Sequence, residues 1–469
     1  GPRAKHGRSL VLSLRAQPSN LVDRFCKTHV MEDYLIESMK HVLVAYRFKP
    51  KEGEFLAAAA LFAAHASTGE GANRAQWNTF AESCNAIVYH ADAESSDVRI
   101  AFHVAIFDRN LRDGRTSVSS LLSLVLGDAE GALELEECEV RDIFLPFGFL
   151  RLFPGPAVTV AAMHRVLGRK PGPGAGLIVG GAVRPDVGLL PEPFAKACSD
   201  FWQGGDLAAT GRLMGNQPFC PLQDCISAVV EAMRSCIAQT GHEKLFVAGI
   251  TADDQLELLD RGHCVLEGFG PLAPNCSMLL QGGPNGLAAL AAARRSFPSQ
   301  FLHYQSTCGS GSTAPAGQRE YSPYVHAKLA RLAGASGFWL DAEGLLEHGP
   351  VLEVLQHDEV DGPCYHQSWQ GMLPTTPVLS GRLTPLSLPA LFDSLGHSDI
   401  IVAPGDGVFG HRSGPRQGAT ACRQAEEAWM LWRRSGRGTL ASTLVSQAPN
   451  QPELLGAFAS FPDEADATC

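Results

Sequence analysis

Residues 190–209 read LPEPFAKACSDFWQGGDLAA, and this stretch carries the strongest information about the fold. A helical stretch, EPFAKACSDFW (192–202), leads into a short apolar run, GGDLAA (204–209), that is typical of a β-strand. Helices packed on a mostly parallel sheet are one of the few stable layer architectures. The stretch therefore predicts an α/β protein.

Eight apolar, β-rich runs alternate with helical stretches between residues 176 and 404. The helical stretches include ISAVVEAMRSCIAQ (226–239) and LPALFDSLG (388–396). Eight strand–helix units over about 300 residues predict a (β/α)₈ barrel, whose chemistry lies where strands end and helices begin. The apolar runs are GLIVGGAV (176–183), GGDLAA (204–209), KLFVAGI (244–250), SMLLQ (277–281), FLHYQ (301–305), SGFWL (336–340), TPVLS (376–380) and DIIVAP (399–404).

The first 150 residues have a different pattern, with helices and antiparallel-type strands that predict a small α+β domain. Strands are expected at 41–48, 87–92 and 98–107, and helices at 55–66 and 117–127.

An acidic run at 134–139 is either a docking patch or, in our preferred interpretation, the solvated face of a strand or helix. The segment FPGP at 153–156 marks the domain boundary. We expect a flexible basic tail at 1–25, an N-terminal α+β domain at 26–150 and a barrel domain at 151–469.

The composition excludes several classes of protein. The 469 residues are 45% hydrophobic and 19% charged, as in an ordinary globular protein. A net charge of −11 argues against a nucleic-acid partner, which needs basic surface. No apolar run reaches the roughly 18–20 residues that span a bilayer, so we expect no integral membrane protein. The 13 cysteines lack paired spacing, which predicts free thiols in a reducing compartment.

The first 20 residues, GPRAKHGRSLVLSLRAQPSN, are basic and contain no acid. This composition suits the remnant of an organellar transit segment, and it suits a cloning scar with a disordered tail equally well.

Long collinear segments resemble the form II Rubisco (ribulose-bisphosphate carboxylase) large subunit, from about residue 33 to about residue 465. The resemblance implies a small N-terminal domain followed by a barrel. It also implies a head-to-tail dimer in which each N-terminal domain covers the partner's barrel mouth. The segments include LVAYRFKP (43–50), RLFPGPA (151–157), LPEPFAKACSDFWQGGD (190–206), KLFVAGITAD (244–253), KLARLAGASG (328–337) and FASFPDEAD (458–466).

The metal-binding positions of the family have changed in this chain. In the family, a lysine carbamylated by CO₂ ends the second barrel strand, and it holds Mg²⁺ together with an aspartate and a glutamate. The resemblance places Ala209, Gly211 and Arg212 at these positions. None of the three offers the oxygen ligands that Mg²⁺ demands, so we expect neither a metal nor another cofactor.

The family's base is the first lysine of a KPK motif, which reads Arg184-Pro185-Asp186 here. An arginine stays protonated near neutral pH and cannot act as a base. The lysine of the family's mobile loop aligns with Glu347, which has the opposite charge.

Positions that the resemblance assigns to substrate and phosphate have changed as well. The family's His-Arg pair after the fifth strand is Gln305-Ser306, and the histidine ending the sixth strand is Trp339, which we expect to fill the barrel mouth. A carboxylate at a phosphate-binding turn repels the anion that the turn's amides attract. The remaining changed positions are Arg382 and Asp406 after strands seven and eight, and His65 and Asp128 in the N-terminal domain.

These changes spare the packing segments, which predicts a catalytically inactive Rubisco-derived protein without catalytic residues. It would act as a structural or interaction subunit of an organellar assembly, as a homodimer or within a larger complex. We expect the plastid stroma, with the mitochondrion as the alternative. A repurposed barrel enzyme with new chemistry is the second hypothesis. An active form II carboxylase is the third, and the missing metal set opposes it.

Overall fold

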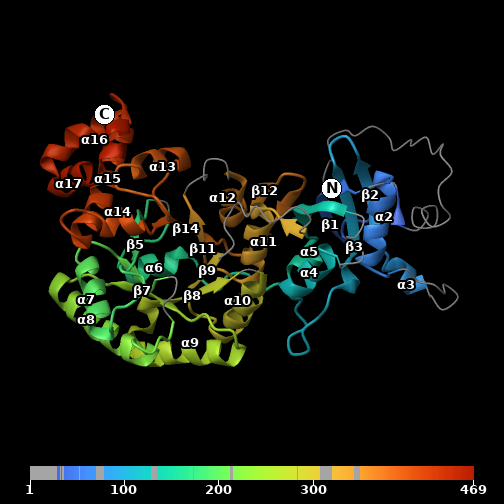
Figure 1. Ribbon diagram of the computed structural model, residues 1–469, viewed down its shortest axis with the longest axis horizontal. Coiled ribbons are helices and arrows are strands. Elements are labelled where there is room, and N and C mark those ends of the chain that lie inside the picture. Colours follow the sequence, from blue (N-terminus) through green and yellow to red (C-terminus); the bar gives the residue numbers. More distant parts are fainter. Residues whose placement is uncertain are drawn as a thin grey trace. The chain divides into compact units, whose positions relative to one another are not determined.

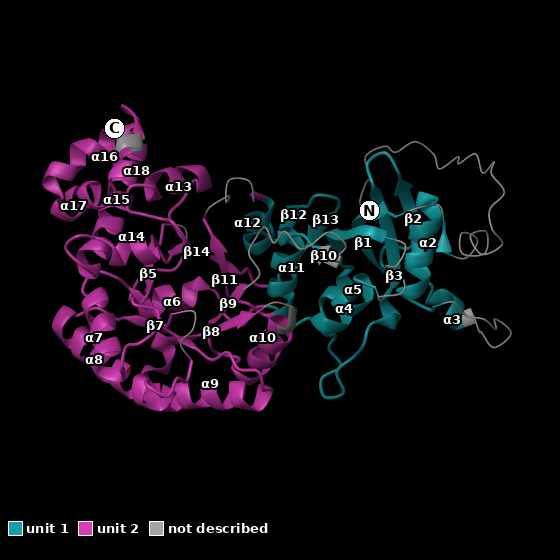
Figure 2. Ribbon diagram, viewed as in Figure 1, with its two compact units in different colours: residues 1–155, 308–333, 350–372 teal, residues 156–307, 334–349, 373–469 magenta. Residues whose placement is uncertain are grey.

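The computed structural model describes residues 29–31, 33, 36–51, 53–69, 79–127, 135–172, 174–211, 215–282, 284–306, 319–342 and 349–468. The chain divides into two compact units, coloured teal and magenta in Figure 2. The N-terminal unit contains residues 1–155, 308–333 and 350–372. The barrel unit contains residues 156–307, 334–349 and 373–469.

A five-stranded sheet of order β10-β4-β1-β3-β2 forms the centre of the N-terminal unit. β1 pairs antiparallel with β3 and β4, and β10 pairs parallel with β4. The strands are β1 (His41–Pro50), β2 (Ile87–Asp92), β3 (Asp97–His103), β4 (Leu135–Phe144) and β10 (Arg319–Tyr321). The other elements are α2 (Phe55–His65), α3 (Thr79–Ser83), η3 (Val104–Ile106), α4 (Val118–Val125), α5 (Phe147–Leu150), α11 (Pro323–Ala333), α12 (Gly349–Gln356, of which Gly349 belongs to the barrel unit), β12 (Glu359–Asp361) and β13 (His366–Ser368).

The structure confirms most elements predicted for this unit and shortens one. The strand expected at 98–107 ends at His103, because the chain turns into η3, where the amide of Ala105 donates to His103 Nδ1 at 3.3 Å. Residues 135–139 of the acidic run lie in β4, with Glu136 half-buried and its Oε2 2.9 Å from Lys49 Nζ, and Glu134 lies outside the described residues. The described glutamates of the run are thus partly exposed on a strand, as the preferred interpretation expects.

The barrel unit contains the predicted closed barrel, in the order β11-β14-β15-β5-β6-β7-β8-β9 with every neighbouring pair parallel (Figure 1). All eight predicted apolar runs form its strands. These are β5 (Ile178–Ala182), β6 (Leu207–Ala209), β7 (Leu245–Gly249), β8 (Cys276–Gly282), β9 (Leu302–Ser306), β11 (Gly337–Asp341), β14 (Thr376–Ser380) and β15 (Ile401–Val402). The helices are α6 (Val160–Val166), α7 (Pro191–Trp202), α8 (Leu222–Thr240), α9 (Gln255–Phe269), η4 (Gly270–Asn275), α10 (Pro284–Ser296), α13 (Leu388–Leu395), α14 (Gly405–Phe409), α15 (Pro415–Ser435), α16 (Leu440–Gln447), η6 (Ala448–Asn450), α17 (Pro452–Ser460) and α18 (Pro462–Thr468).

The stretch at 190–209 shows how the sequence determines the packing of one helix and the strand that follows it. Helix α7 buries a stripe that includes Phe201 and Trp202, and the Trp202 indole donates to the carbonyl of Leu245 at 3.0 Å. A Cβ on Gly205 would lie 2.3 Å from the Phe201 ring, so only glycine fits the turn that follows. Asp206 then accepts a hydrogen bond from the amide of Val179 at 3.0 Å, which fixes the start of β6 beside β5. Local close packing thus determines where β6 begins and ends.

None of the described helices is long and apolar enough to cross a membrane. Every cysteine within the described ranges is a free thiol, as predicted, and most of these thiols are buried.

Candidate functional site

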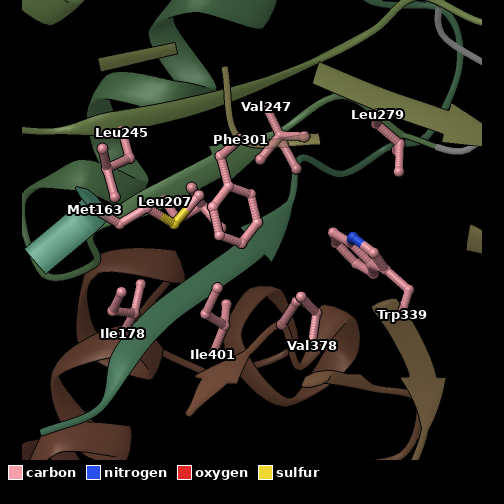
Figure 3. Packing of buried hydrophobic residues seen from close by; sticks show 12 residues of the cluster. Met163, Ile178, Leu207, Leu245, Val247, Leu279, Phe301, Trp339, Val378 and Ile401 are labelled. Atoms are coloured by element: carbon pink, nitrogen blue, oxygen red, sulfur yellow. The ribbon is translucent and has the colours of Figure 1, made fainter. Parts of the chain in front are cut away.

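The carboxyl ends of the barrel strands form a polar layer above an apolar floor. Alternate residues of a strand point to the same side, and Leu279, Trp339 and Val378 meet inside the barrel (Figure 3). Gln281 lies two residues beyond Leu279, at the end of β8, and its side-chain amide donates to Gln305 Oε1 at 2.8 Å. The mouth of the barrel therefore combines polar groups with an apolar floor.

Trp339 closes part of this floor and is only 8% exposed. Its indole N–H donates to His303 Nδ1 at 3.2 Å, so the ring proton of neutral His303 is on Nε2. Nε2 in turn donates to Ser277 Oγ at 3.2 Å. Burial lowers the pKa of His303 to about 3, so the ring stays neutral and keeps its acceptor for the indole. This hydrogen-bonded column fixes the orientation of Trp339.

Arg184 is a cation of the mouth, two residues beyond the end of β5. Its guanidinium contacts the carboxylate of Asp186, and its Nε lies 3.6 Å from Asp406 Oδ1 at the start of α14. The side chains of Arg184 and Asp186 are 36% and 42% exposed, so a dissolved molecule can reach both. The structure thus brings together three of the residues that the sequence singled out.

The end of β6 does not fit a magnesium ion. The methyl group of Ala209 is fully buried in the barrel core, and Gly211 has no side chain. A Cβ on Gly211 would lie 3.0 Å from both Oδ1 and the backbone carbonyl oxygen of Asp186, so Asp186 already fills the space beside the strand end. No group of three His, Cys, Asp or Glu side chains in the described ranges is arranged to hold a metal ion. We therefore assign no reaction step to a metal here.

The other predicted positions are more dispersed. Ser306 is half-buried beside Gln305, and Arg382 is exposed after β14. His65 ends α2 in the N-terminal unit. Asp128, Arg212 and Glu347 lie outside the described residues.

Sequence reasoning missed Gln281 and His303. Their signal was present, because SMLLQ (277–281) and FLHYQ (301–305) both end in glutamine, at positions that alternation turns into the barrel. The two glutamines are also direct neighbours in the register of β8 and β9.

Two family descriptions match the chain. The description "ribulose bisphosphate carboxylase large chain, catalytic domain" matches residues 159–461, and the corresponding N-terminal domain matches residues 29–149.

The chain is also similar to individual proteins of this kind. It is 45% identical to the chloroplastic ribulose bisphosphate carboxylase of Heterocapsa triquetra, covering 94% of this chain and 61% of the relative. It is 44% identical to a ribulose bisphosphate carboxylase of Symbiodinium sp., of which it spans 30%. It is 40% identical to the ribulose bisphosphate carboxylase of Polaromonas naphthalenivorans, covering 95% of this chain and 96% of the relative.

A solved structure has the same fold. The dimeric archaeal Rubisco of Hyperthermus butylicus superimposes with a TM-score of 0.79 at 25% identity, over 93% of this chain and 98% of that chain.

These relatives contradict the expectation that the chain is not an enzyme. Proteins 40–45% identical to it over most of its length are named as carboxylases, which points to an enzyme. The prediction was wrong because it equated the changed metal, base, loop and phosphate positions of the family's site with the loss of all catalysis. The barrel mouth still presents charged and polar groups that a substrate can reach.

Proposed function

Because the chain belongs to the ribulose bisphosphate carboxylase large-chain family, we propose that it is a barrel enzyme whose reaction does not use a carbamate-bound magnesium ion. The reaction takes place at the carboxyl ends of the strands, as in other barrels of this type. The observation that carries this proposal is the contact between Arg184 and Asp186 over the end of β6, where Gly211 leaves space for the carboxylate.

The reaction class that fits these groups is proton transfer on a small molecule with a phosphate or carboxylate group. A guanidinium binds such anions with two parallel hydrogen bonds. An anion that binds Arg184 displaces Asp186, and the freed carboxylate is then a base beside the bound molecule. Asp406 Oδ1, 3.6 Å from Arg184 Nε, remains a second carboxylate beside the guanidinium during this exchange.

The side-chain amides of Gln281 and Gln305 and the indole of Trp339 help to orient a bound molecule. Gln281 and Gln305 offer hydrogen bonds to hydroxyl or carbonyl groups. The indole N–H of Trp339 is already used by His303, so Trp339 presents only apolar surface to a bound molecule.

The test is solvent exchange followed by NMR. Purified protein is incubated with ribulose bisphosphate in D₂O, and deuterium incorporation next to the carbonyl group is measured with and without EDTA. We expect exchange that EDTA does not affect and that Arg184→Gln or Asp186→Asn abolishes. Exchange or carboxylation that requires Mg²⁺ would refute the metal-free reaction, and no exchange at all would refute this substrate and reaction class.

We also propose that the chain assembles, as a homodimer or as a subunit of a larger plastid complex, and that it derives from the form II branch. Support comes from the motifs quoted above, from the chloroplastic relative and from the structural neighbour described as dimeric. Native mass spectrometry of the purified chain and immunogold labelling of cells test these points. A monomer at micromolar concentration would refute the first, and labelling confined to mitochondria would refute the plastid.

A further inference from the structure

The two sides of the barrel mouth differ in charge. In the closed order of eight strands, β5 and β9 are separated by three strands in either direction, so their carboxyl ends lie on opposite sides of the mouth. Arg184 follows β5, whereas the end of β9 carries Gln305 and the end of its neighbour β8 carries Gln281. A ligand that lies across the mouth therefore has a cation at one end and uncharged amides at the other.

Cations are few in the described part of the mouth. We define the mouth residues as those from the last residue of each barrel strand to the fifth residue after it, as far as the structure describes them. Among these described residues, Arg184 and Arg382 are the only cations, and both follow strands that neighbour β15. The same set contains five carboxylates, those of Asp186, Asp253, Asp254, Asp341 and Asp406. A second anionic group on the side of β8 and β9 would therefore meet no compensating charge from these residues.

One further arginine reaches the end of β7 from α9, but its hydrogen bonds are already made. Arg261 Nη1 donates to the carbonyl of Thr251 at 2.5 Å, and Arg261 Nε donates to Glu257 Oε1 at 2.7 Å. The side chain of Arg261 is only 19% exposed. Its charge is thus paired with a carboxylate of its own helix before any ligand binds.

The amides of Gln281 and Gln305 are held in place and keep part of their hydrogen-bonding capacity. The backbone amide of Gln281 donates to Thr251 Oγ1 at 2.9 Å, and its side-chain Nε2 donates to Gln305 Oε1 at 2.8 Å. Within the described ranges, neither Gln281 Oε1 nor Gln305 Nε2 has a hydrogen-bond partner. The pair therefore offers an acceptor and a donor, side by side, to a ligand.

This combination suits hydroxyl groups and does not suit a phosphate. A hydroxyl group both donates and accepts, so hydroxyl groups can satisfy Gln281 Oε1 as well as Gln305 Nε2. A phosphate carries about −1.5 to −2 charges at pH 7 and presents strong acceptor oxygens, which would face the carbonyl oxygen of Gln281. A site built for hydrogen bonds discriminates against a ligand that leaves its polar groups unpaired.

We propose that the substrate is a sugar monophosphate, which binds Arg184 with its single phosphate and the Gln281–Gln305 pair with its hydroxyl groups. This inference rests on the proposed function for the anion at Arg184, and it adds the chemistry of the opposite end. The barrel mouth thus selects a molecule with one charged end and one polyhydroxylated end over a bisphosphate.

Isothermal titration calorimetry in the presence of EDTA tests this with ribulose 5-phosphate and ribulose bisphosphate, which differ by one phosphate. The variant Gln305→Arg adds a cation on the side of the mouth opposite Arg184. Gln239→Arg is the matched control, because it makes the same change at an exposed position near the end of α8, where the chain leads into the start of β7.

We expect the wild type and Gln239→Arg to bind ribulose 5-phosphate about tenfold more tightly than the bisphosphate, or better, and Gln305→Arg to remove or reverse this preference. A wild type that binds the bisphosphate as tightly as the monophosphate, or that does not bind the monophosphate at millimolar concentration, overturns the proposal. The same ratio of dissociation constants in folded Gln305→Arg and Gln239→Arg also overturns it, and circular dichroism shows whether each variant is folded.

This measurement is separate from the test of the proposed function, because calorimetry does not depend on turnover. Absence of deuterium exchange together with a preference for the monophosphate would refute the proposed reaction alone. Exchange together with a preference for the bisphosphate would refute the inferred substrate alone.

Discussion

Replacing Trp339 by phenylalanine tests the hydrogen-bonded column inside the barrel. The change removes the indole N–H, so Nδ1 of buried His303 loses its donor, which costs about 1–3 kcal/mol. The lost ring also reduces the buried apolar surface of a side chain that is 8% exposed, which costs about 1 kcal/mol more. We expect the free energy of unfolding of the barrel to fall by about 2–4 kcal/mol.

Urea unfolding followed by circular dichroism at 222 nm measures this change without relying on tryptophan fluorescence. Trp432→Phe is the control, because its indole is half-exposed and water can replace the lost bond. A double-mutant cycle with His303→Phe isolates the bond, and we expect a coupling energy of at least about 1 kcal/mol. A cost below about 0.5 kcal/mol for Trp339→Phe, or no coupling to His303, would refute the reasoning.

Three further predictions follow from buried or crowded groups. The pKa of His303 is lowered to about 3, so between pH 6.5 and pH 3 its ring is protonated only in the unfolded chain. The free energy of unfolding should therefore fall as the pH falls through this range, by up to about 1.4 kcal/mol per pH unit more than in His303→Phe. Urea unfolding of both proteins at several pH values measures the difference. Gly211→Ala puts a methyl group 3.0 Å from the Asp186 carboxylate and should lower stability by about 1–3 kcal/mol, measured in the same way. In the wild type, Lys328 Nζ lies 2.8 Å from the carboxylate of the fully buried Asp142. Lys328→Met leaves this carboxylate without its cation and should lower the free energy of unfolding by about 3–5 kcal/mol. Hydrogen exchange measures this change as a loss of protection in β4.

The sequence predicted the barrel because its signal is local and repeated. Each strand is a short apolar run, and each following helix has an apolar stripe, so the eight units could be found one by one. Helix α7 is an example, since its buried residues Phe194, Cys198 and Phe201 follow helical spacing. The sequence did not predict that β3 ends at His103, because the turn depends on the ring nitrogen of that residue accepting from the backbone. Such a contact has no pattern in the sequence.

The candidate site was predictable only as a set of positions. The resemblance identified Arg184, Asp186 and Asp406 as changed residues but gave no reason to expect them to meet. Their contact depends on side-chain geometry around the end of β6, where Gly211 leaves room for a carboxylate. The role of His303 was missed for a similar reason, because its partner Trp339 lies 36 residues away in sequence. Neither the pairing nor the lowered pKa of the ring can be seen without the fold.

The replacements at the mouth depend on one another, which limits what a single reversion can restore. An aspartate at position 211 would enter space that the Asp186 carboxylate occupies, and two carboxylates at contact distance repel each other. A lysine at position 209 would have to leave the apolar core in which Ala209 is fully buried. The guanidinium of Arg184 would still place a positive charge beside any divalent cation bound there. The Arg184–Asp186 pair and the glycine beside it therefore form one alternative arrangement of the strand ends, stable in itself, and not a metal site with one ligand missing.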